Sequence, residues 1–205
     1  MKGILFLFRD MDIAGIQHII EDSIATKQAI VGGQTLMQTV GKIADAITAC
    51  YRNGGKVLFC GNGGSAADAQ HLAAELSGRF YFDRPPLDAE ALHVNSSYVT
   101  AVANDYTYDE IYSRYVNGVG KKGDVLIGIS TSGNSENILR ALKVAKNKEM
   151  VTVAMTGKSG GKMRDIVDFL LNVPSTDTPR IQEAHIMLGH IFCQIVEEDL
   201  FGNNK

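Results

Sequence analysis

Short apolar runs alternate along most of this chain with longer segments of helical periodicity. Each run is five or six residues long, the length and composition expected of a strand buried on both faces of a sheet. The runs cover residues 56–60, 91–95, 124–129, 151–155 and 168–173. Strands that alternate with helices in this way predict an α/β domain with a mainly parallel sheet.

Apolar residues also recur at helical spacing on both sides of Gly32-Gly33, so the first 52 residues are predicted to form two helices. Further helices are predicted over residues 66–76, 136–147 and 180–200. The last of these is apolar around most of its circumference, as expected in a core or at a subunit interface. We therefore predict one domain over residues 1–205, divided into N-terminal helices (1–52) and an α/β core with a C-terminal helix (53–205).

Composition excludes several classes of protein. Lys and Arg number 20 against 23 for Asp and Glu, so no basic excess exists to bind nucleic acid. Three cysteines without a CxxC pair disfavour a disulfide framework and a thiolate zinc site, and they suit a reducing cytoplasm. The apolar run at residues 4–8 is shorter than a signal peptide, and no stretch approaches the roughly 20 apolar residues of a membrane span. We expect a cytoplasmic protein with no membrane partner.

A glycine loop follows the first predicted strand. Gly61-Asn62-Gly63-Gly64-Ser65-Ala66 lies between that strand and a helix, where backbone amides and the helix dipole favour an anion. The loop also fits the loose dinucleotide pattern G-x-G-x-x-[GA]. Asn95, however, stands where ribose recognition would need an acidic residue, so a nicotinamide or flavin cofactor is disfavoured.

A hydroxyl loop follows the third predicted strand, with the sequence Ser130-Thr131-Ser132-Gly133-Asn134-Ser135. Short hydroxyl side chains together with helix amides can bind the peripheral oxygens of a phosphate monoester without a lysine. The chain lacks GxxxxGK[ST], which argues against a nucleotide triphosphatase. The alternative is that these residues only form a turn and cap a helix.

Two pairs of side chains have the spacing of metal ligands. His71 and Glu75 are four residues apart and project about 40° apart on one helix, while Gln182 and His190 are eight residues apart on the last helix. Two imidazoles, a carboxylate and an amide oxygen form a credible four-ligand site for zinc or a similar divalent ion. The alternative is that the histidines are buried structural residues.

Other polar residues have less specific surroundings. The pair Asn104-Asp105 follows an apolar stretch and is interpreted either as a helix cap or as a contact to a hydroxylated ligand. Arg79 follows the helix of Glu75 and is interpreted as reaching a phosphate or a partner subunit, or as forming a surface ion pair. The remaining histidines, His18, His93 and His185, are interpreted as structural. His185 is also interpreted as a neighbour of the metal site, because it lies on the same predicted helix as Gln182.

Five ordered motifs together resemble the bacterial phosphoheptose isomerases of the sugar-isomerase (SIS) superfamily. The resemblance covers nearly the whole chain, and the combination is far more specific than any single motif. The motifs are KVLFCGNGGS (56–65), AQHLAAELSGR (69–79), AND (103–105), ISTSGNS (129–135) and RIQEAHIMLGH (180–190).

The resemblance implies a three-layer α-β-α sandwich around a five-stranded, mainly parallel sheet. It implies an isomerase that interconverts sedoheptulose 7-phosphate and D-glycero-D-manno-heptose 7-phosphate. This reaction is the entry step to the ADP-heptose and GDP-heptose of lipopolysaccharide or other surface glycans. It also implies a cytoplasmic homotetramer with active sites between subunits.

Site residues follow from the same resemblance. One zinc ion per active site would be held by His71, Glu75, Gln182 and His190, and Glu75 and His190 would be the catalytic residues. The implied substrate-binding residues, together with Arg79 from the preceding interpretation, are Asn62, Gly63, Gly64, Asn104, Asp105, Ser130, Thr131, Ser132, Ser135 and Gln182.

Other functions remain open at this point. A non-catalytic SIS module would bind a protein partner, such as the replication initiator DnaA, or sense a sugar phosphate. Such a module needs the phosphate loop but has no need for the carboxylate and imidazole of Glu75 and His190. Another sugar-phosphate isomerase or an aminosugar enzyme would share the hydroxyl loop without the two metal-ligand pairs.

Overall fold

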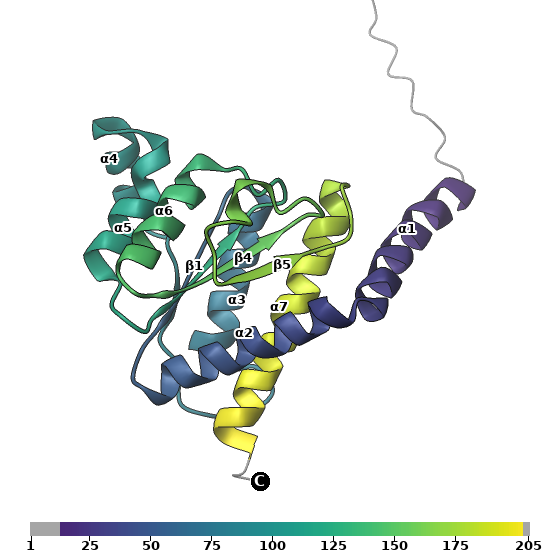
Figure 1. Ribbon diagram of the computed structural model, residues 1–205, viewed down its shortest axis with the longest axis horizontal. Helices are drawn as coiled ribbons and strands as arrows, with labels where there is room; N and C mark the ends of the chain where they lie inside the picture. The colour runs from purple at the N-terminus through teal and green to yellow at the C-terminus, as the bar shows by residue number, and fades with distance from the viewer. Residues whose placement is uncertain (1–12, 203–205) are drawn as a thin grey trace, which may run out of the picture.

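The computed structural model describes residues 13–202, and the predicted α/β sandwich is confirmed (Figure 1). Five parallel strands form one sheet in the order β2-β1-β3-β4-β5. Their bounds are β1 Val57–Gly61, β2 Ala89–Ala91, β3 Val125–Ile129, β4 Val151–Thr156 and β5 Phe169–Asn172. The apolar run at residues 4–8 lies outside the described residues.

Helices cover both faces of the sheet because successive residues of the central strands point to opposite sides. Val57 and Phe59 of β1 pack into one core beneath α2 (Gln34–Arg52), α3 (Gly64–Ser77) and α7 (Thr178–Phe201). Leu58 and Cys60 pack into the other core, beneath α4 (Ser96–Asp105), α5 (Ile111–Val119) and α6 (Glu136–Asn147). All three cysteines are buried free thiols.

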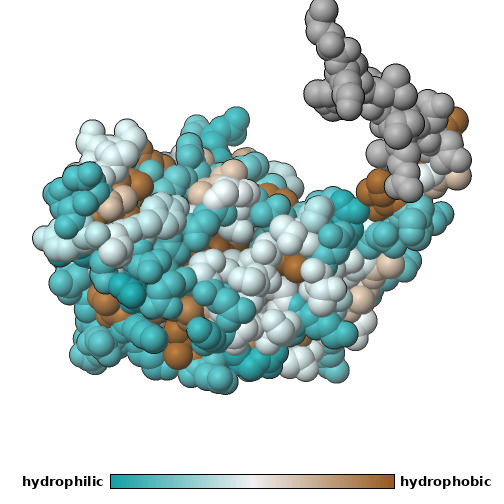
Figure 2. All heavy atoms as spheres, turned by 90° about the horizontal axis from the view of Figure 1, so that it is seen from above, coloured by the Kyte–Doolittle hydropathy of each residue, from teal (hydrophilic) through white to brown (hydrophobic). Residues whose placement is uncertain are grey.

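The N-terminal helices differ in how far they are buried. As predicted, they are separated near Gly32-Gly33, with α1 at Ile13–Gly32. Helix α2 packs on the core, whereas α1 extends away from it, and hydrophobic side chains lie on this projecting arm (Figures 1 and 2). Ile13 at the start of α1 is 76% exposed. No helix within residues 13–202 is long and apolar enough to cross a membrane.

The strand predicted at residues 91–95 is wrong in its bounds, because β2 ends at Ala91. Asn95 instead caps α4, since its Oδ1 accepts a hydrogen bond from the backbone N–H of Tyr98 at 3.0 Å. An asparagine side chain favours such a cap over a continued strand. Helices α4 and α5, which follow, were not predicted as helices.

The close approach of α3 and α7 gives a prediction about Gly189. A β-carbon at residue 189 would lie 2.5 Å from Cδ2 of the buried Leu72 on α3. We expect Gly189→Ala to cost about 1–3 kcal/mol in the free energy of unfolding by urea, because the two helices cannot separate freely. Gly118 on α5 has open space around it, so Gly118→Ala should be neutral or stabilising by up to about 1 kcal/mol. Equal stabilities of the two variants would contradict this packing.

Candidate active site

Three side chains predicted as metal ligands meet between α3 and α7. His71 Nε2 lies 3.0 Å from Glu75 Oε1 on the same helix and 3.1 Å from His190 Nε2 on α7. One potential ligand atom of each residue lies within 4.8 Å of the others. Residues 119 positions apart in the chain therefore form one cluster.

The cluster fits a divalent metal ion. Tetrahedral ligands that each lie 2.0–2.1 Å from a zinc ion are about 3.3 Å apart, close to the separations found here. Two imidazole nitrogens and a carboxylate oxygen are also donors that first-row divalent ions accept. The structure thus contains a possible three-residue metal site, which opens onto a hollow of about 520 Å³ along α3.

The surroundings of His190 favour its neutral, ligating form. Burial lowers the pKa of His190 most strongly, the neighbouring His71 lowers it further, and Glu75 opposes both. The ring of Phe80, from the segment after α3, lies 5.6 Å from the His190 ring, centroid to centroid. The His190 ring, which is partly buried, thus lies close to the rings of both His71 and Phe80.

Gln182, the fourth predicted ligand, lies at the start of α7 against the glycine loop. A β-carbon at Gly64 would lie 2.5 Å from Gln182 Nε2, so a glycine is needed for this approach. Gly64 begins α3 two helical turns before His71, about 10 Å along the axis. The assignment of Gln182 as a metal ligand stays a prediction.

His185 lies in the core. It is fully buried, and its Nε2 is 3.1 Å from the carbonyl oxygen of Thr156 at the end of β4. Burial lowers the pKa of His185 to about 4, although the hydrogen bond to Thr156 opposes this. These contacts support the structural interpretation of this histidine.

His185 should make the protein less stable as the pH falls from about 6.5 to about 4. In the unfolded chain this imidazole takes up a proton with its ordinary pKa of about 6.5, whereas in the folded chain it does so only near pH 4. Protonation between these pH values therefore favours the unfolded state. The loss reaches about 3 kcal/mol over this range. Urea unfolding between pH 4.5 and 7 measures it. The dependence of the free energy of unfolding on pH should become flatter in His185→Asn. It should persist in His18→Gln, a change at an exposed histidine. An unchanged slope in His185→Asn would contradict the prediction.

The predicted phosphate loop gathers its hydroxyls at the start of α6. Ser130 Oγ, which is buried, lies 3.0 Å from Ser135 Oγ and 3.4 Å from Ser132 Oγ. Among the described residues, the Ser135 side chain makes no capping bond to α6, so helix capping does not explain it. Ser132 Oγ does accept from the backbone N–H of Asn134, as a turn residue would.

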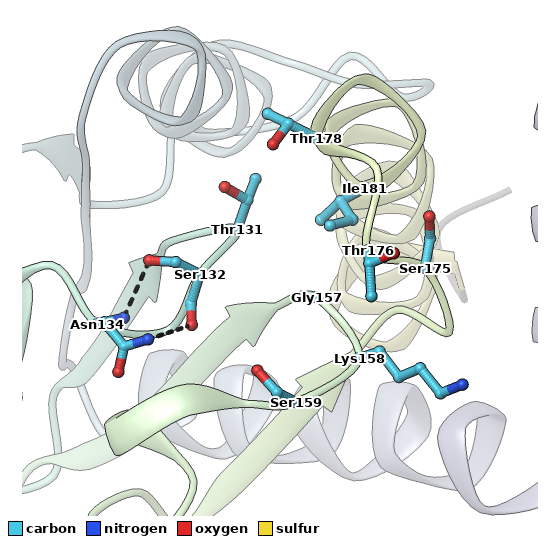
Figure 3. A pocket seen from close by; sticks show the side chains of 10 residues that line it. All are labelled: Thr131, Ser132, Asn134, Gly157, Lys158, Ser159, Ser175, Thr176, Thr178 and Ile181. Carbon is cyan, nitrogen blue, oxygen red and sulfur yellow. Dashed lines mark hydrogen bonds between the residues drawn. The ribbon is translucent and has the colours of Figure 1, made fainter.

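A cavity of about 300 Å³ lies beside this loop, at the carboxyl ends of β3, β4 and β5 (Figure 3). Thr131 and Ser132 line it, and Figure 3 shows the Lys158 side chain extending away from them. Sequence reasoning missed the other lining hydroxyls, although hydroxyl-rich turns after strands could have indicated them. These residues are Ser159, Ser175, Thr176 and Thr178.

The glycine loop is tied to α6 and to the segment after α4. The Asn62 side chain hydrogen-bonds to Asn137 and Tyr108, while Gly63 adopts a φ of 55° that favours glycine. The structure places the other predicted contacts on the surface, at helix ends: Arg79 after α3, and Asn104 with Asp105 at the end of α4.

Comparisons with known proteins identify the family of the chain. The family model described as SIS domain matches residues 17–157. The chain is 52% identical over 181 residues to phosphoheptose isomerase 2 of Campylobacter jejuni, covering 88% of this chain and 90% of that protein. It is 54% identical over 187 residues to phosphoheptose isomerase of Burkholderia pseudomallei, covering 89% and 95%. The structure of phosphoheptose isomerase GmhA from Neisseria gonorrhoeae superposes with a TM-score of 0.84 at 43% identity, covering 89% and 97%.

Proposed function

This chain belongs to the SIS-domain family and, within it, to the phosphoheptose isomerases, and on that premise we propose that it interconverts sedoheptulose 7-phosphate and D-glycero-D-manno-heptose 7-phosphate. The convergence of Glu75, His71 and His190 on one point supports the proposal most strongly. A non-catalytic binding module has no use for this set, so that alternative is not favoured.

Aldose–ketose isomerisation moves a proton between C1 and C2 through an enediolate. The carbon acid is weak, so a base must lie near the carbons and a proton donor or acceptor near the oxygens. We assign the carbon proton to the Glu75 carboxylate and the oxygen proton to the His190 imidazole. The two groups come from different helices and meet in one cluster.

We assign one zinc ion per site to His71, Glu75 and His190, with Gln182 as the fourth ligand. Bound there, the ion would supply electrostatic stabilisation of the developing oxyanion. A carboxylate held by a cation is a weaker base, so Glu75 is assigned as the loosest of the ligands.

The hydroxyl loop is assigned to the phosphate of the substrate. Binding energy at the phosphate, far from C1 and C2, positions the reacting carbons. The assigned phosphate contacts are Ser130, Thr131, Ser132 and Ser135. The assigned sugar contacts are Asn62, Gly63, Gly64, Asn104, Asp105 and Gln182, and Arg79 is assigned to the phosphate or a partner subunit.

Ser132→Ala should raise KM more than it lowers kcat, because the lost hydroxyl contacts a part of the substrate that does not react. We expect KM to rise by about tenfold, the effect of one lost hydrogen bond to a charged group. Ser97→Ala, at an exposed serine on α4, serves as the control. Steady-state kinetics check this, and a large loss of kcat at unchanged KM would contradict simple anchoring.

We further propose a cytoplasmic homotetramer that provides heptose for lipopolysaccharide or other surface glycans. An apolar groove of about 310 Å³ between α1, α2 and α7 supports self-association. So does the exposed apolar face of α1. The hollow beside His71 is open in one chain, which suits an active site completed by a neighbouring subunit.

The proposed reaction can be tested by following sedoheptulose 7-phosphate with NMR in the presence of the purified chain. We expect conversion to the aldose, and far slower conversion of unphosphorylated sedoheptulose, because the hydroxyl loop then has no anion to bind. A chain that binds the sugar phosphate without converting it would instead support the sensing alternative.

A further inference from the structure

Two asparagines join the glycine loop to the hydroxyl loop. Asn62 follows β1, and Asn137 is the second residue of α6, directly after the hydroxyl loop. Their side-chain amides exchange two hydrogen bonds, from each Nδ2 to the other Oδ1, both at 2.9 Å. Asn137 is only 2% exposed, so this amide pair replaces contacts to water that its side chain has lost.

The Asn62 side chain is engaged by further contacts from the protein. Its Oδ1 also accepts a hydrogen bond from the Tyr108 hydroxyl at 3.1 Å, which occupies both lone pairs. The preceding carbonyl, that of Gly61, accepts from the hydroxyl of the buried Tyr112. The Asn62 side-chain amide therefore has one N–H left for a ligand. We assign the other ligand contacts of this loop to the backbone of Gly63 and Gly64.

The amide pair bridges two neighbouring strands of the sheet. Strands β1 and β3 are paired in parallel with Gly61 opposite Ile129. The glycine loop starts at Gly61, and the hydroxyl loop starts at Ser130, directly after Ile129. Loops after strands are the parts of such a fold that can shift most easily. A half-buried cross-link at this point fixes the distance between the amides of one loop and the hydroxyls of the other.

We propose that Asn137 is a positioning residue that, through Asn62, holds the glycine loop and the hydroxyl loop in register so that both bind one phosphorylated sugar. The inference rests on the proposed function for its effect on the substrate. Asn137 itself does not touch the substrate. The side chain of Asn62 is thereby reassigned from a sugar contact to the partner of Asn137.

The test is a double-mutant cycle of Asn62→Ala and Asn137→Ala. Either change leaves the partner side chain without the two bonds of the amide pair, whereas both changes together remove the pair, so the effects should be strongly non-additive. Asn147→Ala, at an exposed asparagine at the far end of α6, is the matched control. Asn137→Asp keeps the volume but loses the donor to Asn62, and it provides a second variant should the alanine variant fold poorly.

Two readouts separate the possible results. We expect hydrogen exchange of the peptide 61–66 to accelerate, and KM for sedoheptulose 7-phosphate to rise about tenfold in either single variant and no further in the double variant. kcat should change by less than about threefold, a split that a merely destabilised fold would not produce.

Unchanged exchange in Asn137→Ala, or additive effects on KM, would overturn the inference while leaving the proposed function intact. Faster exchange at unchanged KM would likewise overturn it. If the chain with its own sequence does not turn over sedoheptulose 7-phosphate, the proposed function is overturned. The expected rise in KM of the Asn62 and Asn137 variants is then overturned with it.

Discussion

Glu75→Gln is expected to lower kcat by about 10²–10⁴-fold, the usual contribution of a general base. The glutamine keeps the shape of the side chain and an oxygen that can ligate a metal, but it cannot accept the carbon proton. The affinity for sedoheptulose 7-phosphate should change far less, because the hydroxyl loop supplies most of the binding. Steady-state kinetics and metal analysis of the purified variant measure the two effects separately.

Glu21→Gln removes the same charge from an exposed position on α1 and serves as the control. It should leave kcat and metal content unchanged. If Glu75→Gln retained near-normal turnover with its metal still bound, Glu75 would not be the base.

The largest expected effect on stability lies at Glu197, a buried residue of α7. Its carboxylate accepts hydrogen bonds from three successive backbone N–H groups, those of residues 80–82, and from Nε of Arg84 at 2.9 Å. Burial, the largest influence, raises the pKa of Glu197, but these bonds together lower it below its usual value. Arg84 also donates to the carbonyl oxygens of Glu75 and Leu76, so the pair ties the end of α3 to α7.

Glu197→Gln should therefore cost about 3–5 kcal/mol in the free energy of unfolding at pH 7, because Arg84 is left as an uncompensated buried charge. The stabilisation by Glu197 is present above the unfolded pKa of about 4.5 and is lost as the pH falls through the lower, folded pKa. Urea unfolding measures the loss of stability in Glu197→Gln at pH 7 and the dependence of stability on pH. Glu198→Gln, at the exposed neighbour, is the control, and equal stabilities of the two variants would contradict the importance of the pair.

The sequence predicted best the elements whose pattern is local. Helix α6 has the predicted bounds of 136–147, since its apolar stripe directly follows a serine-rich turn. The runs that became β1, β3 and β4 are mostly apolar because both faces of the central strands are buried. Strand β2 lies at the sheet edge and has three residues, which leaves no comparable pattern.

The candidate site could be predicted only in part. The spacing of His71 and Glu75 places them on one face of any helix, and the structure keeps them together. That His190 meets His71 depends on how α3 and α7 pack, with Gly189 against Leu72, and no local pattern contains this. The bonds of Arg84 to Glu197 and of Asn62 to Asn137 likewise join residues 113 and 75 positions apart.

The cluster of two histidines and a glutamate is proposed to bind a metal ion and to convert a phosphorylated ketose into an aldose. The most direct measurement is the turnover of sedoheptulose 7-phosphate by the purified chain before chelation, after chelation and after zinc is added back. We predict turnover that chelation abolishes and zinc restores, together with loss of zinc binding in His71→Ala. Full turnover by the chelated, metal-free chain would contradict a role for the metal ion in catalysis.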